Sequence, residues 1–101
     1  MAVDEVFRAL SDPTRRAVVR LLRERGPLTA GEIAERFDLA KSTMSGHFAA
    51  LRVAGLIVAE RQGARVVYSL SLSVFEETVD AVMELLGAGG GRRRVEREAR
   101  R

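Results

Sequence analysis

The sequence contains no cysteine and no tryptophan, and only one of its 101 residues is a histidine. Without cysteine the chain can form no disulfide, no thiolate zinc site and no thiol redox switch. One histidine is too few for a histidine-rich metal site, and it has no acidic partner at a spacing typical of nucleophilic catalysis. We therefore expect no catalytic residues, no metal site and no cofactor.

Long apolar runs are also absent. No segment approaches the about 20 apolar residues that a membrane-spanning helix needs. The first twelve residues contain two early acids and no apolar signal-peptide core, so no secretory signal is expected. The apolar fraction of 47% and the charged fraction of 31% are ordinary for a globular protein of one domain. We expect a cytoplasmic protein with no membrane partner.

Positive charge is concentrated in the middle of the chain and near its end. Residues 39–68 carry a net charge of +3, residues 69–91 carry four acids and no base, and residues 92–101 carry a net charge of +4. Because the final arginines follow a glycine-rich stretch, we expect residues 1–87 to form the folded domain and residues 88–101 a disordered linker and tail. The tail either is simply solvated or adds non-specific affinity for DNA.

Apolar residues at helical spacing predict four helices in the first half of the chain. The expected helices cover residues 3–10, 13–25, 30–37 and 41–54. Asp12 followed by Pro13 is typical of a helix start, because aspartate caps the free N–H groups and proline has none to lose. Thr29 and Glu32 have the form of a capping box, which favours a helix start at residue 30.

Beyond the fourth helix, apolar residues recur at every second position, the spacing typical of β-strands. Residues 56–61 and 65–70 are rich in β-branched side chains and flank a glycine turn, which predicts a β-hairpin. Ser73 and Glu76 have the form of a second capping box, so a fifth helix is expected over residues 74–86. This order of elements predicts a mainly α fold with a β-hairpin, that is, a winged helix-turn-helix.

The expected fourth helix is the second helix of the helix-turn-helix, whose N-terminal residues meet base edges in the major groove. Met44, Phe48 and Leu51 mark its core side, whereas the opposite side is bare and carries Gly46 and Ala49. A bare side can pack closely against DNA, or it is a sparsely decorated solvent face. The candidate DNA-binding residues of this helix are Lys41, Ser42, Thr43, Ser45, Gly46, His47 and Arg52.

The tip of the expected hairpin supplies a second set of candidates, Arg61, Gln62 and Arg65. A wing of this kind lays basic side chains along the DNA backbone or into the minor groove. A solvated hairpin tip is the alternative interpretation. Arginine makes up 16 of the 17 basic residues, which suits phosphate contacts but is equally typical of a GC-rich genome.

Four motifs occur in order along the chain, FRALSDPTR at residues 7–15, EIA at 32–34, SGHFAALRVAGLI at 45–57 and YSL at 68–70. Together they resemble the ArsR family of bacterial winged-helix repressors. Residues 14–16 and 29–35 are most similar to its SdpR-like autorepressor subgroup. The resemblance implies a homodimer that represses transcription and pairs through its first and last helices.

The first and last expected helices also carry more apolar surface than a small core needs, because the last is apolar over more than one face. The expected dimer interface comprises Val3, Val6, Phe7, Leu10, Phe75, Val79, Val82, Met83 and Leu86.

Metal-sensing members of the ArsR family place a cysteine pair in the third helix, or histidines and acids in the last. This sequence has neither arrangement. Glu76, Asp80 and Glu84 share one helical face, but carboxylates alone are a poor transition-metal site, and a solvated acidic face accounts for them. We therefore expect a regulator that does not sense metal. His47 is left with two interpretations, a phosphate contact or a structural hydrogen bond to a neighbouring helix.

The expected function is sequence-specific transcriptional repression by a homodimer on double-stranded DNA, at an inverted-repeat operator that controls the protein's own operon. One alternative is a repressor that responds to a small molecule, with an unknown inducer between the first and last helices. Another is a winged-helix module for protein–protein contact, against which the net charge of +3 on residues 39–68 argues.

Overall fold

The computed structural model describes residues 3–87, and the linker and tail expected at 88–101 lie outside these described residues. The elements are, in order, α1 (Val3–Leu10), α2 (Pro13–Arg25), β1 (Leu28–Thr29), α3 (Ala30–Ala34), α4 (Lys41–Val53), β2 (Ile57–Gln62), β3 (Arg65–Leu70) and α5 (Leu72–Leu85). This order confirms the predicted winged helix-turn-helix. No helix within residues 3–87 is long and apolar enough to cross a bilayer.

The start of α2 follows the sequence prediction. The Asp12 carboxylate accepts hydrogen bonds from the backbone N–H groups of Thr14 (2.8 Å) and Arg15 (3.1 Å). These bonds satisfy two of the N–H groups that a helix start leaves free. They also lower the pKa of Asp12, with the bond from Arg15 as the largest cause. At the other end Gly26 adopts a φ of 77°, a conformation that glycine reaches without strain and that ends the helix.

The helix α3 begins as predicted but is shorter than residues 30–37. Both bonds of the capping box are present, from Thr29 N to Glu32 Oε1 (2.9 Å) and from Glu32 N to Thr29 Oγ1 (3.1 Å). After Ala34 the backbone N–H of Phe37 bonds to the carbonyl of Ala34, three residues back rather than four (3.1 Å). This tighter turn ends the helix before residue 37.

The start of α5 corrects the sequence prediction. The helix begins at Leu72, and its N-cap residue Ser71 makes no capping hydrogen bond with its side chain. The capping box expected from Ser73 and Glu76 is therefore wrong, because Ser73 already lies inside the first turn. The helix ends at Leu85, close to the expected end at residue 86.

A three-stranded antiparallel sheet takes the place of the expected two-stranded hairpin. Its strand order is β1-β3-β2, and β1 pairs Leu28 with Tyr68 of β3. The two long strands join through a two-residue turn, Gly63–Ala64, in which Gly63 has a φ of 64°. Glycine at the first turn position is typical of a type II′ hairpin, which matches the twist of the strands.

The core lies between the helices and the inner side of the sheet. As predicted, α4 buries Met44, Phe48 and Leu51. The rings of Phe48 and Tyr68 lie 4.8 Å apart between centroids and tie α4 to β3. The buried apolar residues are Val6, Ala9, Val18, Leu22, Ile33, Met44, Phe48, Leu51, Ala54, Leu56, Ile57 and Tyr68.

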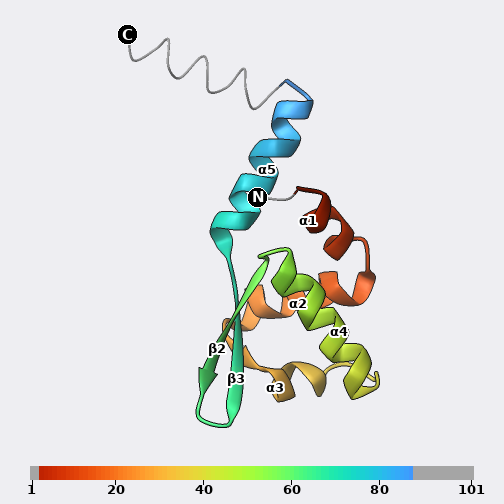
Figure 1. Ribbon diagram of the computed structural model, residues 1–101, viewed down its shortest axis with the longest axis vertical. Helices are drawn as coiled ribbons and strands as arrows, with labels where there is room; N and C mark the ends of the chain where they lie inside the picture. The colour runs from red at the N-terminus through yellow and green to blue at the C-terminus, as the bar shows by residue number, and fades with distance from the viewer. Residues whose placement is uncertain (1–2, 88–101) are drawn as a thin grey trace.

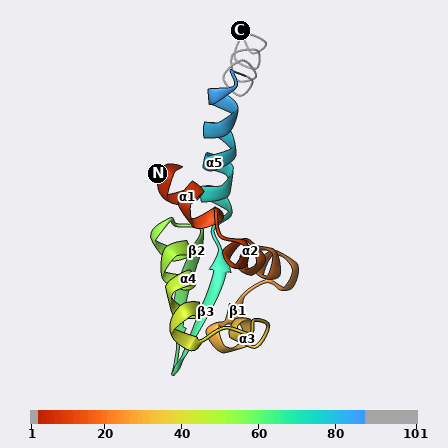
Figure 2. The same cartoon turned by 90° about the vertical axis from the view of Figure 1, so that its right-hand side faces the viewer.

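The described elements separate into two ends (Figure 1). The tip of the β2–β3 hairpin and the N-terminal end of α4 lie at one end of the molecule, and α5 extends from the other. Both views show α1 beside α5, and the two helices are in contact (Figure 2). The hairpin and α4 thus form one exposed end, and α1 and α5 form the opposite end.

Candidate nucleic-acid interface

The exposed side of α4 is bare, as the sequence predicts. Ser42, Gly46 and Ala49 are exposed on the side away from the core. A Cβ atom added at Gly46 would meet no neighbouring atom within 4 Å. This side of the helix is therefore open to close approach by a large partner.

The first turn of α4 adds polar groups to this bare side. Lys41, Ser42 and Thr43 are exposed, and Ser45 follows in the next turn. The N-cap residue Ala40 has no side chain that can accept from the free N–H groups of the turn. An uncapped helix start with hydroxyls and a lysine around it is chemically suited to phosphate oxygens and base edges.

The predicted wing residues lie at the hairpin tip. Arg61 and Gln62 end β2, Arg65 begins β3, and all three are exposed. Arg65 also contributes to lowering the pKa of Glu32, although the backbone hydrogen bond from Thr29 is the largest cause. The positive charge of Arg65 is therefore partly balanced by α3.

Of the two roles considered for His47, the structure shows the hydrogen bond to a neighbouring helix. Arg15 of α2 donates from Nε to His47 Nδ1 over 3.1 Å, and the nearest Asp12 carboxylate oxygen lies 3.9 Å from the same nitrogen. The His47 side chain is only 13% exposed. Sequence reasoning missed Arg15 in this role, since it lies 32 positions away and no local pattern links the two residues.

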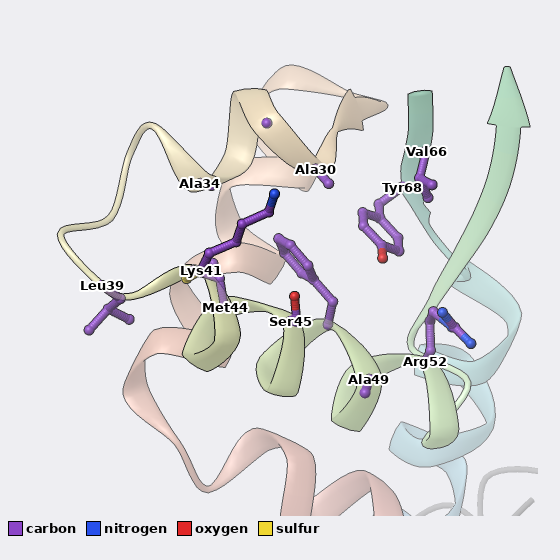
Figure 3. Close-up of a pocket in the computed structure, with 12 residues that line it drawn as sticks. Ala30, Ala34, Leu39, Lys41, Met44, Ser45, Ala49, Arg52, Val66 and Tyr68 are labelled. Atoms are coloured by element: carbon purple, nitrogen blue, oxygen red, sulfur yellow. The ribbon is translucent and has the colours of Figure 1, made fainter. Parts of the chain in front are cut away.

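A groove of about 550 Å³ runs between α4, α3 and the wing (Figure 3). It brings together three predicted DNA-binding residues, Lys41, Ser45 and Arg52. We call it the α4–wing groove, and its lining residues are Ala30, Gly31, Ala34, Leu39, Lys41, Met44, Ser45, Phe48, Ala49, Arg52, Val66 and Tyr68. The sequence did not predict the full lining of this groove, because residues from α3, α4 and β3 meet there only in the folded chain.

At the opposite end, large apolar side chains are exposed. Phe7 of α1 is 44% exposed, and Val79 and Leu86 at α5 are 60% and 75% exposed. The half-buried members of the predicted dimer interface are Val3, Leu10, Phe75, Val82 and Met83. Val6 corrects the prediction, because it is 0% exposed and belongs to the chain's own core.

Acidic residues of α5 do not form a metal centre in the described part of the chain. Within residues 3–87, no group of three or more histidine, aspartate and glutamate side chains is placed to hold a metal ion. Glu76, Asp80 and Glu84 therefore share a helix face without forming such a group.

The known proteins that this chain is similar to are transcriptional regulators. Residues 10–60 match a family described as a helix-turn-helix domain. The chain is 37% identical over 87 residues to the transcriptional repressor SdpR of Bacillus subtilis, covering 86% of this chain and 96% of the relative. The fold is similar to a crystal structure of an ArsR family transcriptional regulator, with a TM-score of 0.74, 34% identity and coverage of 83% and 84%. It is also similar to an ArsR-like transcriptional regulator from Rhodococcus sp. RHA1, with a TM-score of 0.73, 27% identity and coverage of 96% and 90%.

Proposed function

Because this chain belongs to the ArsR family of winged-helix transcriptional repressors, and is a DNA-binding regulator rather than an enzyme, we propose that it acts as a homodimer on an inverted-repeat operator. A repressor has to reach chromosomal DNA, so we place its action in the cytoplasm. The resemblance to SdpR-like autorepressors further suggests the promoter of its own operon as the target.

The observation that carries this proposal is the separation of the two ends. A bare, polar helix side and an arginine-bearing hairpin tip lie at one end, and exposed apolar side chains of α1 and α5 lie at the other. Two copies that pair through the apolar end leave both copies of α4 free to contact DNA. Two-fold symmetry of the dimer then requires a two-fold site, with half-site centres about one helical turn, ~10 bp, or a multiple of it apart.

The roles of the DNA-facing residues follow from their chemistry. Ser42, Thr43 and Ser45 are proposed to contact base edges, since they lie at the start of α4. The proposed backbone contacts come from Lys41, His47, Arg52, Arg61, Gln62 and Arg65. His47 can add such a contact only through Nε2, because Nδ1 already accepts from Arg15. Gly46 is proposed to provide the close approach.

The dimer interface is proposed to comprise the exposed and half-buried residues of α1 and α5. With the buried Val6 removed, its members are Val3, Phe7, Leu10, Phe75, Val79, Val82, Met83 and Leu86. Monomeric proteins rarely expose such a contiguous apolar surface, and a second copy of the same chain would cover it.

Regulation by metals or oxidants is not part of the proposal. The chain has no cysteine, and its described residues contain no cluster suited to a metal ion. Zinc, copper, arsenite and peroxide are therefore expected to leave operator affinity unchanged when each is titrated into a binding assay. A tight, stoichiometric effect of any of them would contradict this expectation. For a metal, Glu76, Asp80 and Glu84 would then be the candidate ligands.

Binding to the DNA upstream of the protein's own gene tests the proposed function. We expect the full-length protein to retard this duplex at far lower concentration than a random duplex, by about 10³-fold or more at physiological salt. Footprinting should reveal a protected inverted repeat. Equal affinity for both duplexes would contradict repression at its own operator, and selection from a random pool would then identify the true site.

A further inference from the structure

The α4–wing groove is lined mainly by apolar side chains although it opens on the proposed DNA-facing side of the molecule. Its apolar lining includes Met44, Phe48 and Tyr68. Figure 3 shows Leu39 and Val66 on opposite sides of it. Its volume of about 550 Å³ lies within the 300–1,000 Å³ of typical small-molecule sites. Surfaces that contact DNA are usually more polar than this lining.

The hydroxyl of Tyr68 is the polar group that stands out inside the groove. The residue is only 6% exposed, and its ring stacks beside Phe48. Figure 3 shows the hydroxyl directed into the groove toward α4. No hydrogen bond joins it to any other residue within 3–87. Since no buried side-chain oxygen in the described residues lacks a partner, the Tyr68 hydroxyl is open to solvent within the groove, where it can donate a hydrogen bond to a ligand that enters.

The charged residues of the groove have one sign. Lys41 and Arg52 line it, and no acidic residue does. Arg52 follows Lys41 by eleven positions along α4, which corresponds to about 16 Å. Figure 3 shows Arg52 on the Tyr68 side of the groove and Lys41 beside Leu39 at the other side. A guanidinium and a free hydroxyl therefore lie at the same end of an apolar hollow.

We propose that the α4–wing groove is an effector site for a small organic anion with an aromatic body, such as an aromatic carboxylate or sulfonate. The anionic group accepts hydrogen bonds from the Arg52 guanidinium and the Tyr68 hydroxyl. The aromatic body lies over Phe48 and Met44. This site differs from a ligand site between α1 and α5, because every lining residue belongs to α3, α4, β3 or the α3–α4 connection.

Occupation of the groove has a direct consequence for DNA binding, which rests on the proposed function. Lys41, Ser45 and Arg52 line the groove and are also proposed DNA contacts. An anion bound there neutralises Arg52 and covers one side of α4. The ligand and the operator should therefore exclude each other, and the ligand would act as an inducer without any change of shape.

Two fluorescent probes with the same aromatic body test the site. One is 8-anilino-1-naphthalenesulfonate, which carries an anionic sulfonate, and the other is N-phenyl-1-naphthylamine, which is uncharged. We expect the full-length protein to bind the sulfonate with one site per protomer and at least about tenfold more tightly than the uncharged probe. Equal affinity for both probes would overturn the anion site.

Two variants locate the probe. Tyr68→Phe removes only the hydroxyl and should weaken sulfonate binding about tenfold. Ala34→Leu fills the groove from α3, outside the proposed DNA contacts, and should abolish probe binding while operator affinity persists. Should Ala34→Leu fail to fold, Tyr68→Phe decides alone. A probe that binds both folded variants like wild type lies elsewhere, for example on α5, and the proposal is then wrong.

Competition with DNA separates this proposal from the proposed function. Operator duplex should displace the bound sulfonate probe, and the probe should raise the apparent Kd for the operator. A probe that needs Tyr68 but is not displaced by DNA would overturn the inducer role alone. If instead Tyr68→Phe weakens operator binding and leaves probe binding unchanged, the hydroxyl serves the DNA backbone and the effector site is refuted.

Discussion

The helices α4 and α5 have nearly equal lengths, 13 and 14 residues, but they expose different kinds of side chain. Along its first three turns the exposed side of α4 carries small or polar residues such as Ser42 and Gly46, and its one exposed large apolar side chain, Val53, is the last residue of the helix, whereas α5 exposes Val79 to 60% in its middle. Within α5 only Thr78 is buried, while α4 buries three large apolar side chains. Two helices of one small domain thus suit different partners, the polar major groove of DNA for α4 and the apolar surface of a second copy for α5.

The largest expected effect comes from Gly46 on the bare side of α4. Gly46→Glu adds bulk and negative charge where the phosphates of DNA would approach, so operator binding should be abolished. Folding should be preserved, because the new Cβ meets no atom within 4 Å. Gel retardation and circular dichroism of the same sample would measure both properties.

The matched control is Gly46→Ala. Alanine is about 1 kcal/mol more favourable than glycine in a helix interior, so this variant should be more stable by about that amount and still bind the operator. If Gly46→Glu bound like wild type, α4 would not be the reading helix.

The next largest effect concerns α5. Val79→Glu places a charge on the exposed apolar stripe and should produce a folded monomer. Loss of the second half-site should then lower operator affinity by about 100-fold or more. Sedimentation would report the assembly state. Ser73→Glu adds the same charge to the polar side of the same helix and should remain dimeric, whereas a dimeric Val79→Glu would exclude this interface.

A smaller effect is expected at the wing. Arg61→Ala or Arg65→Ala should weaken binding to operator and random DNA alike, because backbone contacts carry no sequence information. Each should reduce the slope of log affinity against log salt by about one unit per protomer, that is, by about two units for the dimer on its operator. Arg23→Ala is the matched control, since this arginine lies beside Leu72 and Phe75 and pairs only with Glu24 among the described residues. An unchanged slope in both wing variants would mean that the hairpin tip stays off the DNA.

The smallest effect concerns the pH dependence of the free energy of unfolding, through Asp12 at the start of α2. The pKa of Asp12 is lowered from 3.8, first by the hydrogen bond from the Arg15 backbone, so its stabilisation is present above pH 3.8 and is lost as the pH falls through the lowered value. Asp12→Asn keeps a good cap without a titrating group. Urea unfolding at pH 7 and pH 3 should show less acid destabilisation in Asp12→Asn than in wild type. An identical pH dependence would contradict the assignment.

Much of the fold could be predicted because it depends on local rules. Two helix starts were predicted from the capping side chains of Asp12 and Thr29. The buried side of α4 was predicted from the helical spacing of Met44, Phe48 and Leu51. These signals act within about one or two turns of helix, so the sequence displays them directly.

The errors arose where distant contacts decide the outcome. The strand β1 has only two residues, too few for any periodicity, and exists because Leu28 pairs with Tyr68. Val6 has the spacing of a surface stripe, but the packing of the other helices buries it completely. The bond between Arg15 and His47, like the α4–wing groove, joins segments that are remote in the chain.

The most direct test of the central claim, that one end reads DNA while the other pairs two copies, is the affinity for duplexes with altered half-site spacing. We expect two protomers to bind per duplex, as measured by sedimentation. Inserting about half a helical turn, ~5 bp, between the half-sites should reduce affinity to that of a duplex with a single half-site. One bound protomer per duplex, or an affinity unaffected by the insertion, would contradict the account.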